Sequence, residues 1–182
     1  MNSPRSYTTA WRPGPAARSP PTGSPPCWGD HQARYATNSE YECYLGDLAH
    51  PGHLDHLTGD LNGAYHYPGP WDPGGCGFYL LTTAADGEHR GLARMSLPDK
   101  TLTLIDTPPW DVEGVAVSGD GRTIAWHVNQ DGISVLRPRR DGQAAAVPQF
   151  PAGVIEDLEL SRDGTMAAIL LDTPTAPWKS SS

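Results

Sequence analysis

From residue 39 onward, apolar side chains come in short runs separated by turn-forming residues. Val115 and Val117 alternate with other residues before one such turn, and Ile124, Trp126 and Val128 alternate after it. A period of two is typical of strands with one face packed against neighbouring structure, whereas amphipathic helices show a period near 3.6. The pattern therefore predicts an all-β fold of short strands joined by tight turns.

One turn pattern recurs three times along the chain. Its copies are residues 71–79, 117–125 and 160–168, with Asp72, Ser118 and Ser161 at equivalent positions, 46 and 43 residues apart. This spacing is close to the ~40 to 45 residues of a four-stranded propeller blade and differs from the ~33 or ~34 of helical repeats. Asp-Gly pairs suit hairpin turns, and the hydroxyls of Ser118 and Ser161 can hydrogen-bond the turn backbone.

Further turns divide each repeat into strands. Asp86-Gly87 and residues 98–100 separate predicted strands at 78–83, 92–97 and 101–106, whereas Asp131-Gly132 and Asp141-Gly142 separate strands at 123–129, 133–136 and 145–149. Strands at 41–48, 54–57 and 166–171 are assigned to flanking blades. We predict a partial, open β-propeller of about three four-stranded blades over residues 39–178, since closed propellers need at least about four.

The ends of the chain have a different composition. Residues 1–38 are rich in proline and have no hydrophobic period, so we expect them to be disordered; a proline-rich ligand for a partner domain is a weaker alternative. Residues 179–182 form a polar tail.

Charge and cysteine content narrow the classes of partner. The formal net charge is −8, and because residues 1–40 carry +2, residues 41–182 carry −10. An acidic domain repels phosphate backbones and anionic lipids, so we expect neither nucleic acid nor membrane as a partner. Cys27, Cys43 and Cys76 lack Cys-x-x-Cys spacing, and neither an apolar span nor a secretory leader is apparent. We expect a cytoplasmic protein with no cofactor.

Several stretches resemble the propeller of prolyl oligopeptidase-type serine peptidases, including the acylaminoacyl peptidase and dipeptidyl peptidase IV relatives. They are residues 77–82, 91–94, 110–118 and 129–132. The resemblance implies a propeller that caps an α/β-hydrolase domain and controls the access of peptides to its Ser, Asp and His residues. No Gly-x-Ser-x-Gly elbow occurs here, because Ala116 and Asp120 flank Ser118, and Glu159 and Asp163 flank Ser161. We therefore expect no enzymatic activity from this chain alone.

Two acidic residues are candidate substrate contacts. Glu113 and Glu156 occupy equivalent positions, 43 residues apart, at the start of the inner strands that would line the central channel. They could contact the positively charged amino end of a peptide, although solvated carboxylates are the simpler interpretation.

Histidines and tryptophans form two further groups. His50, His53 and His56 have a spacing that suggests a metal site, but across a turn they would not converge, so exposed turn histidines are favoured and no metal is expected. Trp71, Trp110, Trp126 and Trp178 adjoin turns and are assigned to packing between blades.

Other functions remain open. A stand-alone propeller module could bind proteins or peptides, and unpaired blade edges could pair with a missing α/β-hydrolase domain or with a second copy of the chain. A binding propeller of the TolB type, outside the cytoplasm, is less favoured because no export signal is apparent.

Overall fold

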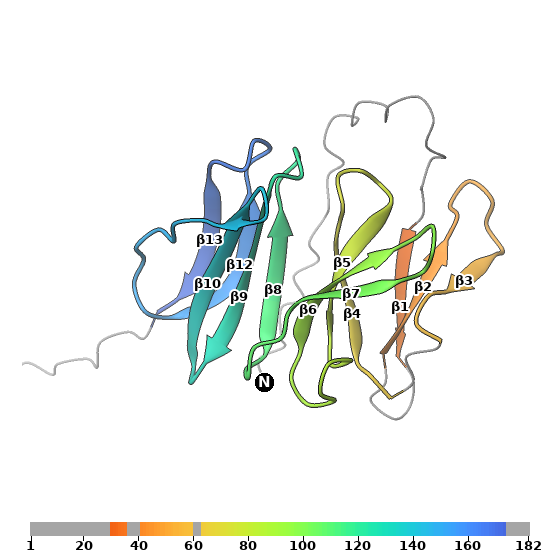
Figure 1. Ribbon diagram of the computed structural model, residues 1–182, viewed down its shortest axis with the longest axis horizontal. Coiled ribbons are helices and arrows are strands. Elements are labelled where there is room, and N and C mark those ends of the chain that lie inside the picture. The colour runs from red at the N-terminus through yellow and green to blue at the C-terminus, as the bar shows by residue number, and fades with distance from the viewer. Residues whose placement is uncertain (1–29, 36–40, 60–62, 174–182) are drawn as a thin grey trace, which may run out of the picture.

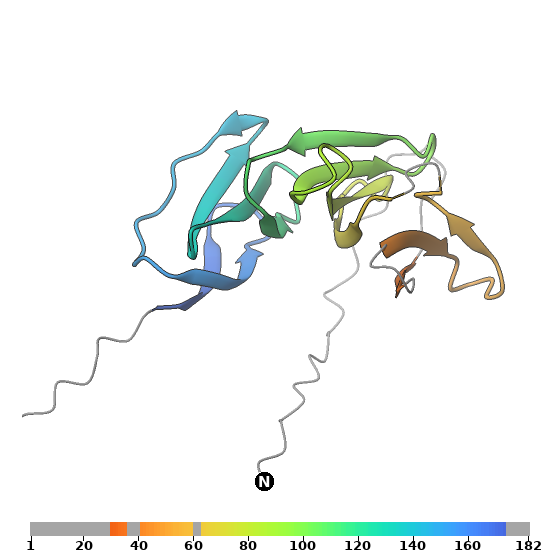
Figure 2. The same cartoon turned by 90° about the horizontal axis from the view of Figure 1, so that it is seen from below.

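Four antiparallel β-sheets lie side by side in the computed structural model, which describes residues 30–35, 41–59 and 63–173 (Figure 1). The described residues form thirteen strands and no helix. Seen from below, the sheets follow an open arc, with the first sheet at one end and the fourth at the other (Figure 2). The all-β prediction is confirmed.

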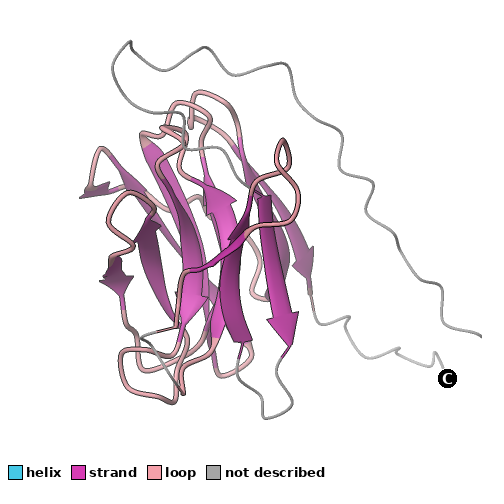
Figure 3. Cartoon of the chain, turned by 90° about the vertical axis from the view of Figure 1, so that its right-hand side faces the viewer, coloured by secondary structure: helices cyan, strands magenta, loops and turns pink. Residues whose placement is uncertain are grey.

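The sheets follow one another in chain order. The first contains β1 (Asp30–Tyr35), β2 (Tyr41–Gly46) and β3 (Leu54–His56). The second contains β4 (His66–Trp71), β5 (Gly77–Thr82), β6 (Gly91–Ser96) and β7 (Leu102–Asp106). The third contains β8 (Val112–Val117), β9 (Thr123–Gln130), β10 (Ile133–Arg140) and β11 (Gln143–Ala144), and the fourth β12 (Val154–Leu160) and β13 (Ala167–Asp172). Figure 3 shows the strands from one end of this array.

The repeated turn joins the first two strands of the second, third and fourth sheets, as predicted. The Thr123 N–H donates to Oγ of Ser118 at 2.9 Å, and the Met166 N–H donates to Oγ of Ser161 at 3.0 Å. Gly121 and Gly164 have positive φ values of 72° and 65°, which non-glycine residues adopt only with strain. Local chemistry thus sets the register of each hairpin.

Hydrophobic cores lie between consecutive sheets. Phe78 and Leu80 of the second sheet pack with Cys43 of the first. Leu92 of the second sheet packs with Trp126 of the third, and Leu136 of the third packs with Leu158 of the fourth. The sheets therefore stack face to face, as blades do, and the predicted packing of Trp126 between blades is confirmed.

The fold differs from the sequence prediction in two places. Strand β1 lies inside the segment 1–38, which was expected to be disordered; it follows the last proline of that segment, Pro26, and its backbone pairs with β2. The other residues of that segment, the tail 179–182 and Trp178 lie outside the described residues.

The second difference concerns the outer edge of the third sheet. A strand was expected at 145–149, but β11 covers only Gln143–Ala144, and β10 runs on to Arg140. The backbone pairing ends where the Ala145 N–H donates to the Pro138 carbonyl at 2.9 Å. Pro148 and Pro151 lack the N–H that would continue a ladder.

Candidate binding pocket between the third and fourth sheets

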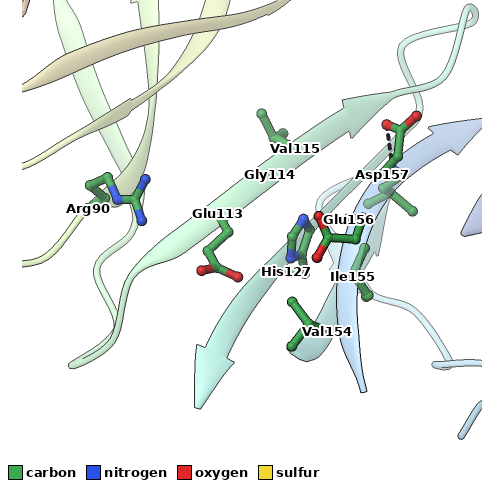
Figure 4. Close-up of a pocket in the computed structure, with 10 residues that line it drawn as sticks. Arg90, Glu113, Gly114, Val115, His127, Val154, Ile155, Glu156 and Asp157 are labelled. Atoms are coloured by element: carbon green, nitrogen blue, oxygen red, sulfur yellow. Dashed lines mark hydrogen bonds between the residues drawn. The ribbon is translucent and has the colours of Figure 1, made fainter. Parts of the chain in front are cut away.

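A pocket of about 460 Å³ opens between β8 and β9 of the third sheet and β12 of the fourth, with Arg90 at one side (Figure 4). Its polar lining includes Glu113, His127, Glu156 and Asp157. The sequence prediction placed Glu113 and Glu156 on neighbouring inner strands, and the structure brings both residues to this one pocket.

Both glutamates are the extra residue of a β-bulge. On β8, Val112 pairs with Val128 and Gly114 with His127, so Glu113 has no residue opposite it. On β12, Ile155 pairs with Leu171 and Asp157 with Leu170, which leaves Glu156 in the same situation. Bulges turn a side chain away from the regular alternation of a strand and are frequent beside binding sites. Successive blades therefore present a carboxylate through the same backbone irregularity.

The two carboxylates have different surroundings. Glu113 is half-buried, and its Oε1 accepts a hydrogen bond from Nδ2 of Asn129 at 3.1 Å. Glu156 is exposed, next to Asp157, whose Oδ1 accepts the Leu158 N–H at 2.9 Å. Arg90 is the basic residue that lines the pocket, and its Nη2 donates to Oδ2 of Asp111 at 3.0 Å. The pocket is therefore acidic and suited to a cation.

His127 is a pocket residue that the sequence analysis did not identify. Its side chain is 4% exposed, and in the part of the chain that the structure describes its Nδ1 has no hydrogen-bond partner. Burial lowers the pKa of this imidazole below its ordinary value of 6.5, although the charge of Glu113 acts in the opposite direction, and this favours the neutral ring.

A glycine leaves the space that this ring occupies. Gly114 pairs with His127 across β8 and β9, and a Cβ at residue 114 would overlap Nε2 of the ring. The available signal in the sequence was a histidine inside the apolar strand 123–130 together with a glycine directly after Glu113.

Other residues singled out by the sequence lie elsewhere. Ser118 and Ser161 belong to turns, where their hydroxyls donate to Asp120 and Asp163 at 2.6 and 2.7 Å. His50 pairs with Asp47, His53 with Asp55, and the His56 ring stacks on Tyr44 at 4.6 Å, so these three imidazoles have separate partners. Trp71 packs against the first core, whereas Trp110 is 37% exposed and does not follow the packing prediction.

Successive antiparallel sheets that follow an arc with hydrophobic cores between them form the blade arrangement of a β-propeller. Among solved structures, the chain is similar to a putative TolB from Agrobacterium tumefaciens, with a TM-score of 0.62 and 18% identity over 76% of this chain and 48% of that one. It is also similar to TolB from Acinetobacter baumannii, with a TM-score of 0.55 and 13% identity over 70% of this chain and 31% of that one. The chain thus spans about half of the first structure and a third of the second.

These comparisons establish the fold as a TolB-like β-propeller. No protein-family model and no curated protein sequence matches the chain. The resemblance to prolyl oligopeptidase-type peptidases is not confirmed by them. Across the described ranges, no helix is long and apolar enough to cross a membrane. The expected cytoplasmic location stays a prediction.

Proposed function

We propose that this chain is a non-catalytic propeller module that binds peptides, with the positively charged amino end of the peptide held at the pocket between β8 and β12. One observation carries the proposal: Glu113 and Glu156 occupy the same bulge in neighbouring inner strands and line one cavity. Solvated surface carboxylates would not need a bulge to orient them. The same bulge at both glutamates therefore favours a binding role.

The chemistry of the pocket suits a peptide end. An ammonium group forms charge-assisted hydrogen bonds to carboxylates, which are about twice as strong as neutral ones. Val115, Val154 and Ile155 supply apolar walls for the adjoining side chain. The volume of about 460 Å³ lies within the ~300 to 1,000 Å³ typical of small-ligand pockets.

A finer proposal assigns this module to the substrate-gating cap of a prolyl oligopeptidase-type serine peptidase, with the α/β-hydrolase domain supplied elsewhere. The four sequence stretches that resemble this family support it, and so does the use of Ser118 and Ser161 as turn residues. The alternative is a stand-alone peptide-binding or protein-interaction module. A fluorophosphonate probe should leave the purified chain unlabelled, and stoichiometric labelling would contradict the non-catalytic role.

The binding proposal can be tested with a tetra-alanine peptide carrying a fluorophore at its carboxyl end. By fluorescence anisotropy, acetylation of the amino end should weaken binding at least about tenfold, because a charged hydrogen bond is lost. The substitutions Glu113→Gln and Glu156→Gln should each weaken binding of the free amine by a similar factor.

Glu159→Gln is the matched control. Glu159 lies exposed on the same strand as Glu156, and its substitution changes the net charge equally, but it does not line the pocket. The affinity of the Glu159→Gln chain for the peptide should stay within about twofold of the affinity of the unmodified chain. Equal affinities for the free and acetylated peptides, or equal losses in all three variants, would refute the proposed site.

A further inference from the structure

We propose that the cation best matched to this pocket is the guanidinium of an arginine side chain, with the imidazole of His127 as a third acceptor beside Glu113 and Glu156. This inference rests on the proposed function and extends it from the amino end of a peptide to an internal arginine. Figure 4 shows the three side chains around the pocket.

The three groups come from three strands. Glu113 lies on β8, His127 on β9 directly opposite Gly114, and Glu156 on β12 of the next sheet. Within the described ranges, no set of three His, Cys, Asp or Glu side chains is placed to hold one metal ion. Acceptors that come from three separate strands suit a polyatomic cation whose N–H groups point in several directions.

His127 supplies the observation that points to a ligand. Its Nδ1 is buried without a hydrogen-bond partner in the described part of the chain, in a side chain that lines an acidic pocket. A buried polar atom left unsatisfied costs about 1 to 3 kcal/mol, and such atoms in native structures usually have a function. Burial favours the neutral ring, and with the ring proton on Nε2, Nδ1 can accept a hydrogen bond from a cationic donor.

A guanidinium matches this set better than an ammonium. It is planar, presents five N–H donors in a fixed fork and is more weakly hydrated, whereas a lysine ammonium presents three donors from one point. Val115 and Val154 can contact the aliphatic stem of the arginine. Arg90 at the side of the pocket is paired with Asp111, which offsets its repulsion of an incoming cation.

Calorimetric titration of the full chain with capped pentapeptides tests this. The series is acetyl-Gly-Gly-X-Gly-Gly-amide, where X is arginine, citrulline, lysine or trimethyllysine, so that no peptide has a free amino end. Citrulline keeps the shape of arginine without its charge, and trimethyllysine keeps a charge without N–H donors. Arginine should bind at least about tenfold more tightly than citrulline or trimethyllysine, and more tightly than lysine.

His127→Phe tests the third acceptor, because it keeps an aromatic ring of similar size and removes both ring nitrogens. The arginine peptide should lose about tenfold in affinity, and this loss should be larger than the loss for the free-amine tetra-alanine peptide. Glu159→Gln again serves as the control. If circular dichroism shows that the His127→Phe chain does not fold, the ranking of the four peptides on the unmodified chain still decides whether the pocket prefers a guanidinium.

The outcomes separate the two proposals. Equal affinity for the arginine and citrulline peptides overturns the inference, and if the free-amine peptide still binds, the proposed function stands. If His127→Phe lowers the affinities for the arginine peptide and the free-amine peptide by the same factor, the inference is also overturned, because the ring would then support the pocket as a whole. Absence of binding by every peptide refutes both.

Discussion

At the scale of single residues, the pocket depends on a glycine as much as on its charged groups. Gly114 follows the bulged Glu113 and leaves the volume that the His127 ring fills. The bulge, the glycine and the buried imidazole are therefore one local arrangement. Any side chain at residue 114 displaces the ring, which has little room to move because it is 4% exposed.

Gly114→Ala should reduce the free energy of unfolding by about 1 to 3 kcal/mol, because overpacking at a buried site forces side chains or backbone to shift. The same substitution should weaken binding of the arginine pentapeptide, because it moves His127. Urea denaturation followed by tryptophan fluorescence measures the first effect, and calorimetric titration measures the second. Gly74→Ala is the control, since a Cβ there would meet its nearest atom, Oδ1 of Asp72, at an ordinary 3.4 Å. Equal stability of both variants would contradict the packing argument.

The pKa of His127 predicts how stability changes with pH. Burial lowers this pKa below the ordinary value of 6.5, so as the pH falls the unfolded chain takes up the proton before the folded chain does. The contribution of His127 to stability is therefore complete above pH 6.5 and is lost as the pH falls through the lower, folded value. The charged groups that line the pocket together with His127 are Glu113, Glu156, Asp157 and Arg90.

Unfolding measured at a series of pH values between 8 and 5 should show this loss. The chain carrying His127→Phe should lose less stability over the same interval, because it has no imidazole to protonate. Parallel stability curves for the two chains would show that His127 is not protonated differently in the folded and unfolded states.

At the scale of strands and sheets, polar contacts join the outer strand of the second sheet to the two middle strands of the third. Oδ2 of Asp106, at the end of β7, accepts hydrogen bonds from Nε1 of Trp126 and Nη1 of Arg137, both at 2.7 Å. These two partners belong to β9 and β10, so one carboxylate connects the second sheet to the third. Its side chain is 19% exposed, which shields the contacts from solvent.

Asp106→Asn should lower the free energy of unfolding by about 1 to 3 kcal/mol, because Arg137 loses its ionic partner in a partly buried position. Asp141→Asn removes an equivalent contact with Arg122, where the two side chains are 57% and 51% exposed, and should cost less, because solvent screens an exposed ion pair. Thermal denaturation of the two variants compares them directly. A larger loss for Asp141→Asn would show that burial does not decide the strength of these pairs.

The sequence predicted the strands best where a turn is set by local chemistry. Asp131 and Gly132 both adopt positive φ, at 52° and 81°, so this pair determines the β9–β10 hairpin without help from distant residues. The bulges at Glu113 and Glu156 were not predicted, because a bulge is defined by the pairing with another strand. The repeat spacing still placed both glutamates together. His127 was missed because its role depends on burial between sheets.

At the scale of the whole molecule, the fourth sheet has an unpaired edge among the residues that the structure describes. Its described part has two strands beside a third sheet of four, and Leu170 on β13 is 63% exposed. Open edges with apolar side chains readily pair with another strand.

We expect the purified chain to self-associate through this edge. Sedimentation velocity over a wide range of concentrations should show a monomer giving way to larger species. Leu170→Lys should shift this equilibrium toward the monomer, because a charge on an edge strand opposes pairing. Leu48→Lys is the control, since Leu48 is 75% exposed but lies in the loop after β2. A monomer at every concentration would contradict the open edge.

Because the walls of the pocket belong to two different sheets, occupancy of the pocket and attachment of the terminal hairpin are thermodynamically linked. A bound peptide would contact both β8 and β12, so that β12 and β13 could detach only after the peptide had dissociated. Amide protons of that hairpin would then exchange with solvent more slowly as peptide is added, whereas those of β2 and β3, at the other end of the arc, would keep their rates.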